Sequence, residues 1–440
     1  MKKLMLGLAL CGLLSSPLVA ADELMDITRQ AGYTDVQEIN RPKSSIIVDA
    51  KTGSVVWSDN PDAVRDPASM SKLMTLYLVF EALEAGKITE DTTIRATESD
   101  EAITKIHAIS NNKIVAGVDY TISELITMTA VPSSNATTVM LANYLSNNDP
   151  DKFLDMMNAK AKELGMDHTQ WNNASGAAAV AFQGLYNPKR YDIQSANQTT
   201  ARDLAILGMA FVRKHPQILN YTKDAVVTVK AGTPYQETFE TYNYSLPGAR
   251  YALEGVDGLK TGSSPEGAFN YISTIERNGQ RFVEVIMGVG DWSDQNGEYY
   301  RHPFGNALAE KAFADFDYKL VLGKGEQEID GQKVVLEEDV YATLRKGEEP
   351  KVSLVNGQVV VDNGLSNISP KWENSIKVSQ VRENGQKTEQ KADHIQTSLY
   401  QETQDLWHEF GYWLLLPPIL LLILIFLLVR GRRKSKRRRP

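Results

Sequence analysis

The chain has 440 residues, of which 42% are hydrophobic and 23% charged, so it can bury the cores of two or more domains. Between an N-terminal lysine pair and a C-terminal basic run, residues 22–429 hold 37 basic and 55 acidic side chains, a net charge of −18. An acidic body of this kind excludes a nucleic-acid-binding surface.

Residues 1–21 predict a secretory signal peptide. The lysine pair precedes an apolar run at 4–14, and Val19-Ala20-Ala21 has the small residues of a cleavage site. Cys11, the one cysteine, lies in this run and follows a leucine, whereas a lipoprotein anchor needs a small residue there. We therefore expect Cys11 to be removed, which leaves a mature chain without disulfides or thiol chemistry.

The first elements expected in the mature chain are a β-hairpin and a helix. Strand-like runs at 45–49 and 54–58 flank the turn Ala50-Lys51-Thr52-Gly53. Asp66 is predicted to cap the helix and Pro67 to be its first residue, and the apolar residues that follow recur at helical spacing.

Ser69 lies in the first turn of this helix, with Lys72 three residues on along the same face. A serine hydroxyl is a poor nucleophile until a base removes its proton. A lysine can be that base where burial and nearby cations lower its pKa. The pair also fits an ordinary helix start with a solvated lysine, so its assignment depends on motifs further along.

The middle of the chain is mostly helical, with helices expected at 122–128, 136–145, 153–164 and 200–210. Ser133-Ser134-Asn135 falls at a loop–helix junction within this lobe. Strands then return at 253–261, 269–277 and 281–289, followed by a closing helix at 306–316. Lys260-Thr261-Gly262-Ser263 lies at the end of the first of these strands.

Strands at both ends of residues 22–318 with helices between them predict an α+β domain, in which one antiparallel sheet carries a helical lobe. Asn278-Gly279 is a strong two-residue hairpin signal between the last two strands. Residues 319–386 predict a small all-β domain. Its short apolar runs, separated by Asp-Gly and Asn-Gly pairs, are at 334–336, 340–344, 352–355, 359–361 and 376–381.

The C-terminal part predicts a membrane anchor helix. Residues 387–409 are expected to form a linker and an amphipathic helix, and 410–429 are uncharged over roughly 30 Å of helix, the thickness of a bilayer core. The eight basic residues in the tail at 430–440 place that end on the cytoplasmic side. A segment that lies in the membrane interface without spanning it is the alternative. We expect the catalytic domain on the extracytoplasmic face, in a bacterium of the Gram-positive type.

Ser69-x-x-Lys72, Ser133-x-Asn135 and Lys260-Thr261-Gly262, in this order, are the signature of penicillin-recognising serine acyltransferases. With further stretches at 67–75, 161–166, 200–204 and 255–262, the chain resembles the D-alanyl-D-alanine carboxypeptidases, low-molecular-mass penicillin-binding proteins of peptidase family S11. The resemblance covers about 43–318 and implies a penicillin-binding/β-lactamase-like transpeptidase domain without a metal or other cofactor. A second Lys-Thr-Gly, at 51–53, precedes Ser69 and is interpreted as a turn.

The resemblance implies a catalytic role for three residues. Ser69 would attack the carbonyl of the penultimate D-alanine and form an acyl-enzyme. Lys72, kept neutral by burial and by Lys260, would be its general base. Ser133 would relay the proton to the leaving D-alanine.

The remaining motif residues are implied to bind substrate. Asn135 would hold the peptide amide, and Lys260, Thr261 and Ser263 would bind the terminal carboxylate. Gly262 is also implied to be a substrate-binding residue, since small residues there let a substrate approach the backbone. The backbone N–H groups of Ser69 and Ser263 would form the oxyanion hole. The sequence departs from the family pattern at Ser134, where many relatives have glycine, and at 172–177, which lacks the usual Gly-Leu ending.

The implied partners are peptidoglycan stem pentapeptides ending in D-Ala-D-Ala, β-lactams as covalent inhibitors, and membrane lipid through the C-terminal segment.

A D,D-endopeptidase acting on cross-links is the nearest alternative function, because the same acyl chemistry serves both enzymes. A class A β-lactamase would need a deacylating glutamate, which 167–172 lack. Six scattered histidines form no metallopeptidase motif. A non-enzymatic wall-binding protein would not need Ser69, Lys72, Ser133 and Lys260 together.

Overall fold

The computed structural model describes residues 23–372, 375–377 and 379–380, which form two compact units. The larger unit contains the described residues up to Gly323 together with 338–353 and 360–376. The smaller contains 324–337, 354–359 and the described residues after 376. The expected signal peptide, linker, amphipathic helix, transmembrane segment and basic tail lie outside the described residues. Among the helices that are described, none has the length and apolar character needed to cross a bilayer.

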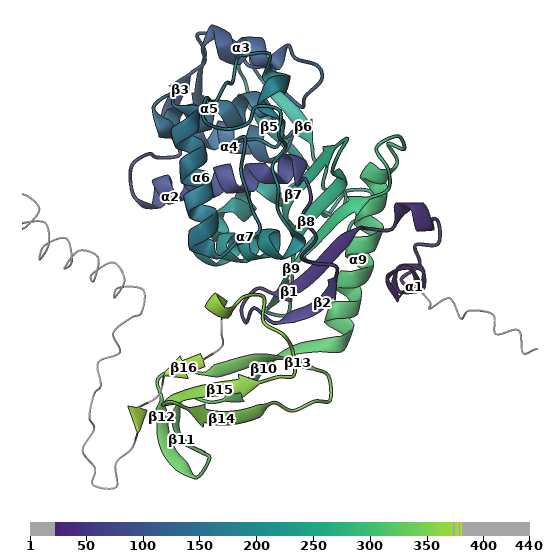
Figure 1. The fold of residues 1–440 in the computed structure, drawn as a ribbon, viewed down its shortest axis with the longest axis vertical. Helices are drawn as coiled ribbons and strands as arrows, with labels where there is room; N and C mark the ends of the chain where they lie inside the picture. The colour runs from purple at the N-terminus through teal and green to yellow at the C-terminus, as the bar shows by residue number, and fades with distance from the viewer. Residues whose placement is uncertain (1–22, 373–374, 378, 381–440) are drawn as a thin grey trace, which may run out of the picture. The chain divides into compact units, whose positions relative to one another are not determined.

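A five-stranded antiparallel sheet is the centre of the larger unit (Figure 1), in the order β2-β1-β9-β8-β7. Its strands are β1 (Ser44–Asp49), β2 (Val55–Asp59), β7 (Val256–Ser264), β8 (Ala268–Arg277) and β9 (Gln280–Val289). Strand β1 pairs directly with β9, so the two ends of the domain sequence meet in one sheet. This confirms the expected antiparallel sheet and places β7 at its edge.

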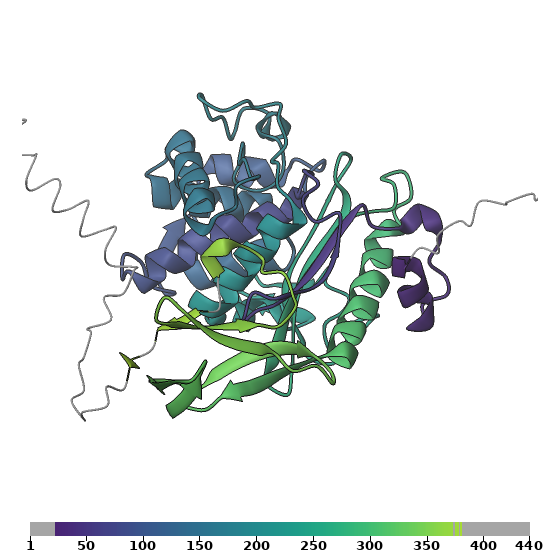
Figure 2. The same cartoon turned by 60° about the horizontal axis from the view of Figure 1, so that its bottom comes forward.

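Helices cover both faces of this sheet, with the helical lobe on one side and α1 and α9 on the other (Figure 2). Ile46 and Val48 of β1 face the lobe, whereas Ile47 between them faces α1 and α9, as strand alternation requires. The helices are α1 (Glu23–Gln30), α2 (Lys72–Glu84), α3 (Glu98–Thr104), α4 (Ile122–Ala130), α5 (Asn135–Ser146), α6 (Pro150–Leu164), α7 (Ala201–Lys214), α8 (Leu219–Thr222) and α9 (Gly297–Asp315). Two small hairpins complete the unit, β3 (Thr93–Arg95) with β4 (Asp119–Thr121) and β5 (Val226–Val229) with β6 (Glu237–Glu240).

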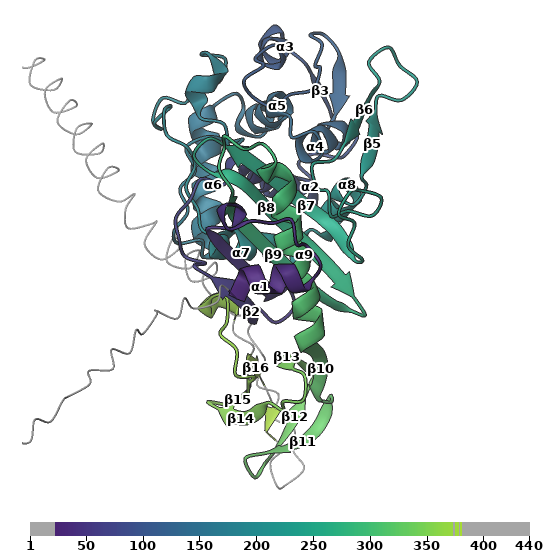
Figure 3. The same cartoon turned by 90° about the vertical axis from the view of Figure 1, so that its right-hand side faces the viewer.

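Two helices begin elsewhere than expected. Asp66 does accept a bond from the Ala68 N–H at 2.8 Å, but residues 68–71 form a 3-10 turn, and the α-helix begins only at Lys72. Helix α9, which is labelled in Figure 3, begins nine residues before the expected start. Its first residue is Gly297, and it contains Pro303. Its first half has proline, polar and charged residues, so hydrophobic periodicity gave no signal for it.

The strands expected between 334 and 361 are confirmed, and the last expected run divides into two short strands. The strands are β10 (Phe316–Leu322), β11 (Gly325–Ile329), β12 (Gln332–Leu336), β13 (Val340–Arg345), β14 (Lys351–Val355), β15 (Gln358–Asp362), β16 (Ser375–Lys377) and β17 (Ser379–Gln380). Strands β10 and β11 were not expected, because their alternating polar residues hide them from a search for apolar runs. Asp330-Gly331 and Asn356-Gly357 have the positive φ values of tight hairpin turns.

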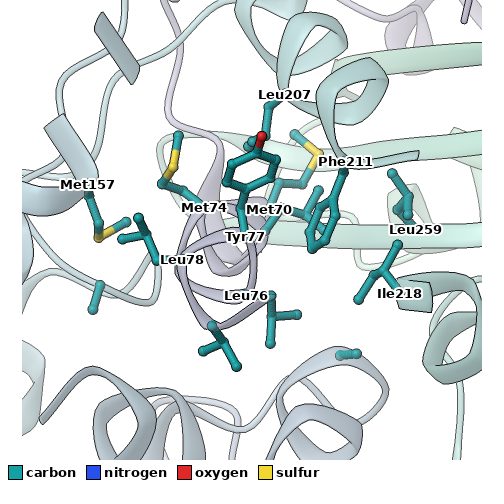
Figure 4. Packing of buried hydrophobic residues seen from close by; sticks show 14 of the residues in the cluster. Met70, Met74, Leu76, Tyr77, Leu78, Met157, Leu207, Phe211, Ile218 and Leu259 are labelled. Atoms are coloured by element: carbon teal, nitrogen blue, oxygen red, sulfur yellow. The ribbon is translucent and has the colours of Figure 1, made fainter. Parts of the chain in front are cut away.

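Helix α2 is buried on every side, and this fixes the turn that precedes it. Every residue from Met70 to Phe80 is buried, and the side chains in Figure 4 pack around the helix from α6, α7 and β7. Each fully buried apolar side chain of this kind contributes about 1.5–3 kcal/mol. The helix therefore holds residues 68–71 in place from the core outward.

Gly176 fixes the same turn from the outside. A Cβ at Gly176 would lie 1.9 Å from the Ala68 carbonyl oxygen and 2.8 Å from the Ser69 nitrogen. Its φ of +96° is also one that side-chain-bearing residues rarely adopt. Only glycine allows this loop to pack against the backbone of Ser69.

Gly176→Ala is therefore expected to destabilise the protein more than Gly184→Ala. Both glycines have positive φ, but a Cβ at Gly184 meets nothing within 4 Å. Because the strain of positive φ is common to both variants, the difference reports the clash, expected at about 1–3 kcal/mol. Urea unfolding of the two variants measures it, and equal unfolding free energies would contradict the close packing.

Candidate active site

A cleft of about 520 Å³ in the larger unit brings the three motifs together. Its lining includes Ser69, Ser133, Asn135 and residues 261–263 from the end of β7. Lys72 and Lys260 are buried at 0% and 2% exposure. Within the described residues, no three His, Cys, Asp or Glu side chains are grouped as a metal site would require.

The Lys72 side chain is held by three contacts. Its Nζ lies 3.1 Å from Ser69 Oγ, and it donates to Asn135 Oδ1 at 2.9 Å and to the Ser175 carbonyl at 2.8 Å. The last two partners can only accept hydrogen bonds. A neutral amine that donates to both of them directs its remaining lone pair toward the Ser69 hydroxyl.

Burial is the main reason that the pKa of Lys72 lies well below its usual 10.5, and the charge of Lys260 is the second. A buried ammonium without an anionic partner loses solvation that hydrogen bonds to two neutral acceptors replace only in part. The neutral form, which a general base requires, is therefore favoured.

The second motif contributes two residues to the cleft lining and one to the start of α5. Ser133 has φ of 62°, which is uncommon for a residue with a side chain, and its buried Oγ has no hydrogen-bond partner among the described residues. Asn135 donates from Nδ2 to the Ser110 carbonyl at 2.8 Å, which orients its Oδ1 toward Lys72. Ser134, where many relatives have glycine, is the N-cap of α5 and accepts from the Thr137 N–H.

Lys260 is the first residue of the third motif. Its side chain is buried and donates to the Thr261 carbonyl at 3.2 Å. Burial, and next the charge of Arg301, lower its pKa to about 7. Gly262 allows β7 to pack against the nucleophile turn, since a Cβ there would lie 2.4 Å from the Pro67 carbonyl oxygen and 3.0 Å from the Ser69 nitrogen. The structure thus brings all eight sequence-derived site residues to one place.

Arg301 is a site residue that the sequence did not reveal. It comes from the unexpected first half of α9, is 1% exposed, and donates to Ser263 Oγ at 3.0 Å and to the Asn270 carbonyl at 3.2 Å. Burial lowers its pKa to about 10, so it remains charged at neutral pH. It adds a second cation to the place where Lys260 and Thr261 were expected to bind a carboxylate.

The stretch at 172–177 supports the nucleophile despite its departure from the family pattern. Asn197 accepts from the Asn172 and Asn173 N–H groups at 2.7 and 3.0 Å and donates to Ser71 Oγ at 2.9 Å. This network holds the Ser175 carbonyl that contacts Lys72. A lone asparagine gives no sequence signal of such a function.

The earlier Lys51-Thr52-Gly53 is a turn, as expected. Lys51 donates to the Gly279 carbonyl, and Thr52 bonds to Ser54 Oγ and to Thr343 Oγ1 at 2.8 Å. A Cβ at Gly53 would lie 3.1 Å from Asn367 Oδ1. This copy of the motif holds neighbouring segments of the larger unit together.

Comparison with known proteins agrees with this geometry. The model of the D-alanyl-D-alanine carboxypeptidase family, Peptidase S11, matches residues 32–291, and that of a domain of unknown function, DUF1958, matches 318–379. D-alanyl-D-alanine carboxypeptidase DacF of Bacillus subtilis (strain 168) is 24% identical over 336 residues, which are 73% of this chain and 77% of that protein. DacA of Escherichia coli (strain K12) is 24% identical over 359 residues, covering 79% of this chain and 80% of that one.

Solved structures share the fold. A peptidoglycan synthesis regulatory factor (PBP3) from Streptococcus pneumoniae has a TM-score of 0.66 at 25% identity, over 77% of this chain and 97% of that one. Penicillin binding protein 5 from Haemophilus influenzae has a TM-score of 0.61 at 22% identity, over 78% and 97%. The chain belongs to the D-alanyl-D-alanine carboxypeptidase family, S11, and is a serine-type hydrolase of that kind.

Proposed function

We propose that this protein removes the terminal D-alanine from peptidoglycan pentapeptide stems through an acyl-enzyme on Ser69. The observation that carries the proposal is the environment of Lys72 Nζ. This nitrogen is fully buried and lies 3.1 Å from Ser69 Oγ, and its other partners among the described residues are two acceptors. A neutral amine in this position can accept the proton of the serine hydroxyl.

Acylation follows from these positions. Neutral Lys72 takes the hydroxyl proton while Ser69 Oγ forms a bond to the carbonyl carbon of the penultimate D-alanine. The tetrahedral oxyanion accepts hydrogen bonds from the backbone N–H groups of Ser69 and Ser263, which is often the largest single contribution to catalysis. When the C–N bond breaks, the leaving amine takes a proton that passes from Lys72 through the unpartnered Ser133 Oγ.

The C-terminal carboxylate of the substrate would lie at Lys260, Thr261 and Ser263, with Arg301 behind Ser263. The two buried cations, Lys260 and Arg301, attract the carboxylate. The charge of Lys260 has a second effect, because it lowers the pKa of Lys72. Water then attacks the acyl carbonyl, Lys72 again accepting a proton, and the tetrapeptide stem leaves with Ser69 restored. Such trimming would take part in cell-wall maturation and limit cross-linking.

A D,D-endopeptidase is the second candidate function. A D-alanyl-D-alanine endopeptidase of Escherichia coli (strain K12) is 28% identical, but over 169 residues that cover only 37% of this chain and 52% of that protein. The carboxypeptidase relatives match over about twice that length, which favours the carboxypeptidase.

We also propose that β-lactams acylate Ser69 and that the C-terminal segment at 410–429 anchors the enzyme in the membrane, with its active site on the extracytoplasmic face. Twenty uncharged residues followed by eight basic ones support the anchor. The acidic body, with its net charge of −18, would itself be repelled by an anionic leaflet.

The nucleophile is tested with fluorescent penicillin and with a pentapeptide. Intact-mass measurement is expected to show one adduct on the wild-type protein and none on Ser69→Ala, because the acyl bond requires Oγ. D-alanine release should disappear in the same variant. An adduct that persists on Ser69→Ala assigns acylation to another residue.

The rate of acylation is expected to follow a bell-shaped dependence on pH. Its acid limb reports Lys72, which must be neutral, and its alkaline limb reports Lys260, whose pKa of about 7 sets where its charge is lost. Lys260→Ala removes a cation that lowers the pKa of Lys72. The acid limb should therefore move to higher pH, and kcat/KM should fall by on the order of 10²-fold.

Lys51→Ala is the matched control, because it changes the lysine of the other Lys-Thr-Gly, in a turn outside the cleft. Its kcat/KM and pH profile should stay within a few-fold of the wild type. Equal losses in the two variants would show that the assignment of the two motifs is wrong.

The anchor is tested with a chain that ends at Asp393. It should keep full activity on a soluble peptide, since every proposed site residue lies before 302. Without the apolar segment it should leave the membrane fraction. If the shortened chain still pellets with membranes in high salt, attachment lies elsewhere in the protein.

A further inference from the structure

The proposed chemistry fixes the direction in which a substrate lies along β7. This strand is at the edge of the sheet, where an extended peptide can lie alongside it. The carboxylate end is assigned to Lys260 and Thr261, and the scissile carbonyl to the N–H groups of Ser69 and Ser263. The acyl part of the peptide must therefore continue past Ser263, toward the turn between β7 and β8.

The residue before the two D-alanines then lies next to that turn. An extended chain advances about 3.3 Å per residue, so a single residue beyond the scissile one reaches Ser264 to Glu266. A long side chain on that residue would extend over the rim of the cleft, which Ser264, Pro265, Glu266 and Trp292 line.

This rim presents an aromatic face and a carboxylate. Trp292 is 37% exposed and stacks on Phe269 with ring centroids 5.5 Å apart, and Phe269 pairs with Ser263 across β7 and β8. Trp292 is thereby placed on the acyl side of the scissile bond. Glu266 is exposed in the turn that connects the two strands. An aromatic ring beside a carboxylate suits an alkylammonium group.

Within the part of the chain that the structure describes, no ion pair neutralises the Glu266 carboxylate at this rim. The carboxylate of Asp66 is close enough to interact with it; Asp66 also interacts with the charge of Arg65 and accepts a hydrogen bond from Ser264 Oγ at 2.5 Å. Among the described residues that line the cleft, the basic side chain is Arg301, which is buried and bonded to Ser263. Ser133 Oγ, buried and without a described partner, shows independently that the cleft is built to receive a polar ligand.

We propose that the rim formed by Glu266 and Trp292 binds the free side-chain amine of a diamino acid that precedes the two D-alanines. The substrate class is thus narrowed to stem peptides in which this amine is uncapped. The inference rests on the proposed function and goes beyond it, since the acyl chemistry at Ser69 needs no group at this position.

Three pentapeptides test the proposal. They are identical except that the lysine before D-Ala-D-Ala carries a free amine, an Nε-acetyl group, or two Nε-methyl groups. Because acetylation removes the charge, wild-type kcat/KM should fall roughly tenfold for the acetylated peptide. The dimethylated peptide adds bulk but keeps the charge, so it should stay close to the free amine.

Glu266→Gln and Trp292→Leu should each bring the rate ratio of free to acetylated peptide toward one and leave the acetylated peptide unaffected. Glu254→Gln is the control, because Glu254 is exposed before the opposite end of β7 and does not line the cleft. Its ratio should equal that of the wild type.

The outcomes distinguish a failure of amine binding at the rim from a failure of the proposed D-alanine release. Equal kcat/KM for the free and acetylated peptides in the wild type, or a ratio that Glu266→Gln leaves unchanged, overturns amine binding at this rim while D-alanine release stands. If none of the peptides releases D-alanine, the proposed function fails, and the inference with it.

Discussion

The active site depends on the burial of the Lys72 amine between acceptors and without an anion. Asn135 Oδ1 and the Ser175 carbonyl fix its position, and both belong to segments distant in sequence from α2. The helix, the start of α5 and the loop at 172–176 must therefore assemble before Ser69 has a base. A solvated lysine at the same spacing would be charged at neutral pH and could not take a proton.

The cleft has three buried basic side chains close to one another, which are Lys72, Lys260 and Arg301. Within the described residues none of them forms an ion pair, and burial lowers the pKa of each. These three basic groups belong to an acidic chain, which carries a net charge of −18 between residues 22 and 429. The carboxylate of the substrate supplies the negative partner that these basic groups lack. The same buried positive charge therefore binds the carboxylate and lowers the pKa of the general base.

The sequence allowed the sheet and most helices to be predicted, because each of these has a local signal. The eight proposed site residues came from the order of three short motifs and the family that this order resembles. Ser69 and Lys72 share a helical turn, and Asn278-Gly279 marks its hairpin by dihedral preference. Arg301 and Asn197 could not be found in this way. Each acts through contacts with residues far along the chain, and a single polar residue has no periodicity to identify it. The 3-10 turn at 68–71 was also missed, because it results from the close packing of Gly176.

The two Lys-Thr-Gly tripeptides show why order and surroundings carry the information that composition lacks. At 51–53 the motif ends a hairpin, and its threonine bonds to other hydroxyls of the fold. At 260–262 it lies on an edge strand that packs against the Ser69 turn, with a second cation behind it. Only the second position combines a free strand edge, a buried ammonium and a nearby nucleophile. The same three side chains are structural in one place and suited to catalysis in the other because burial and the strand edge differ, not because the residues do.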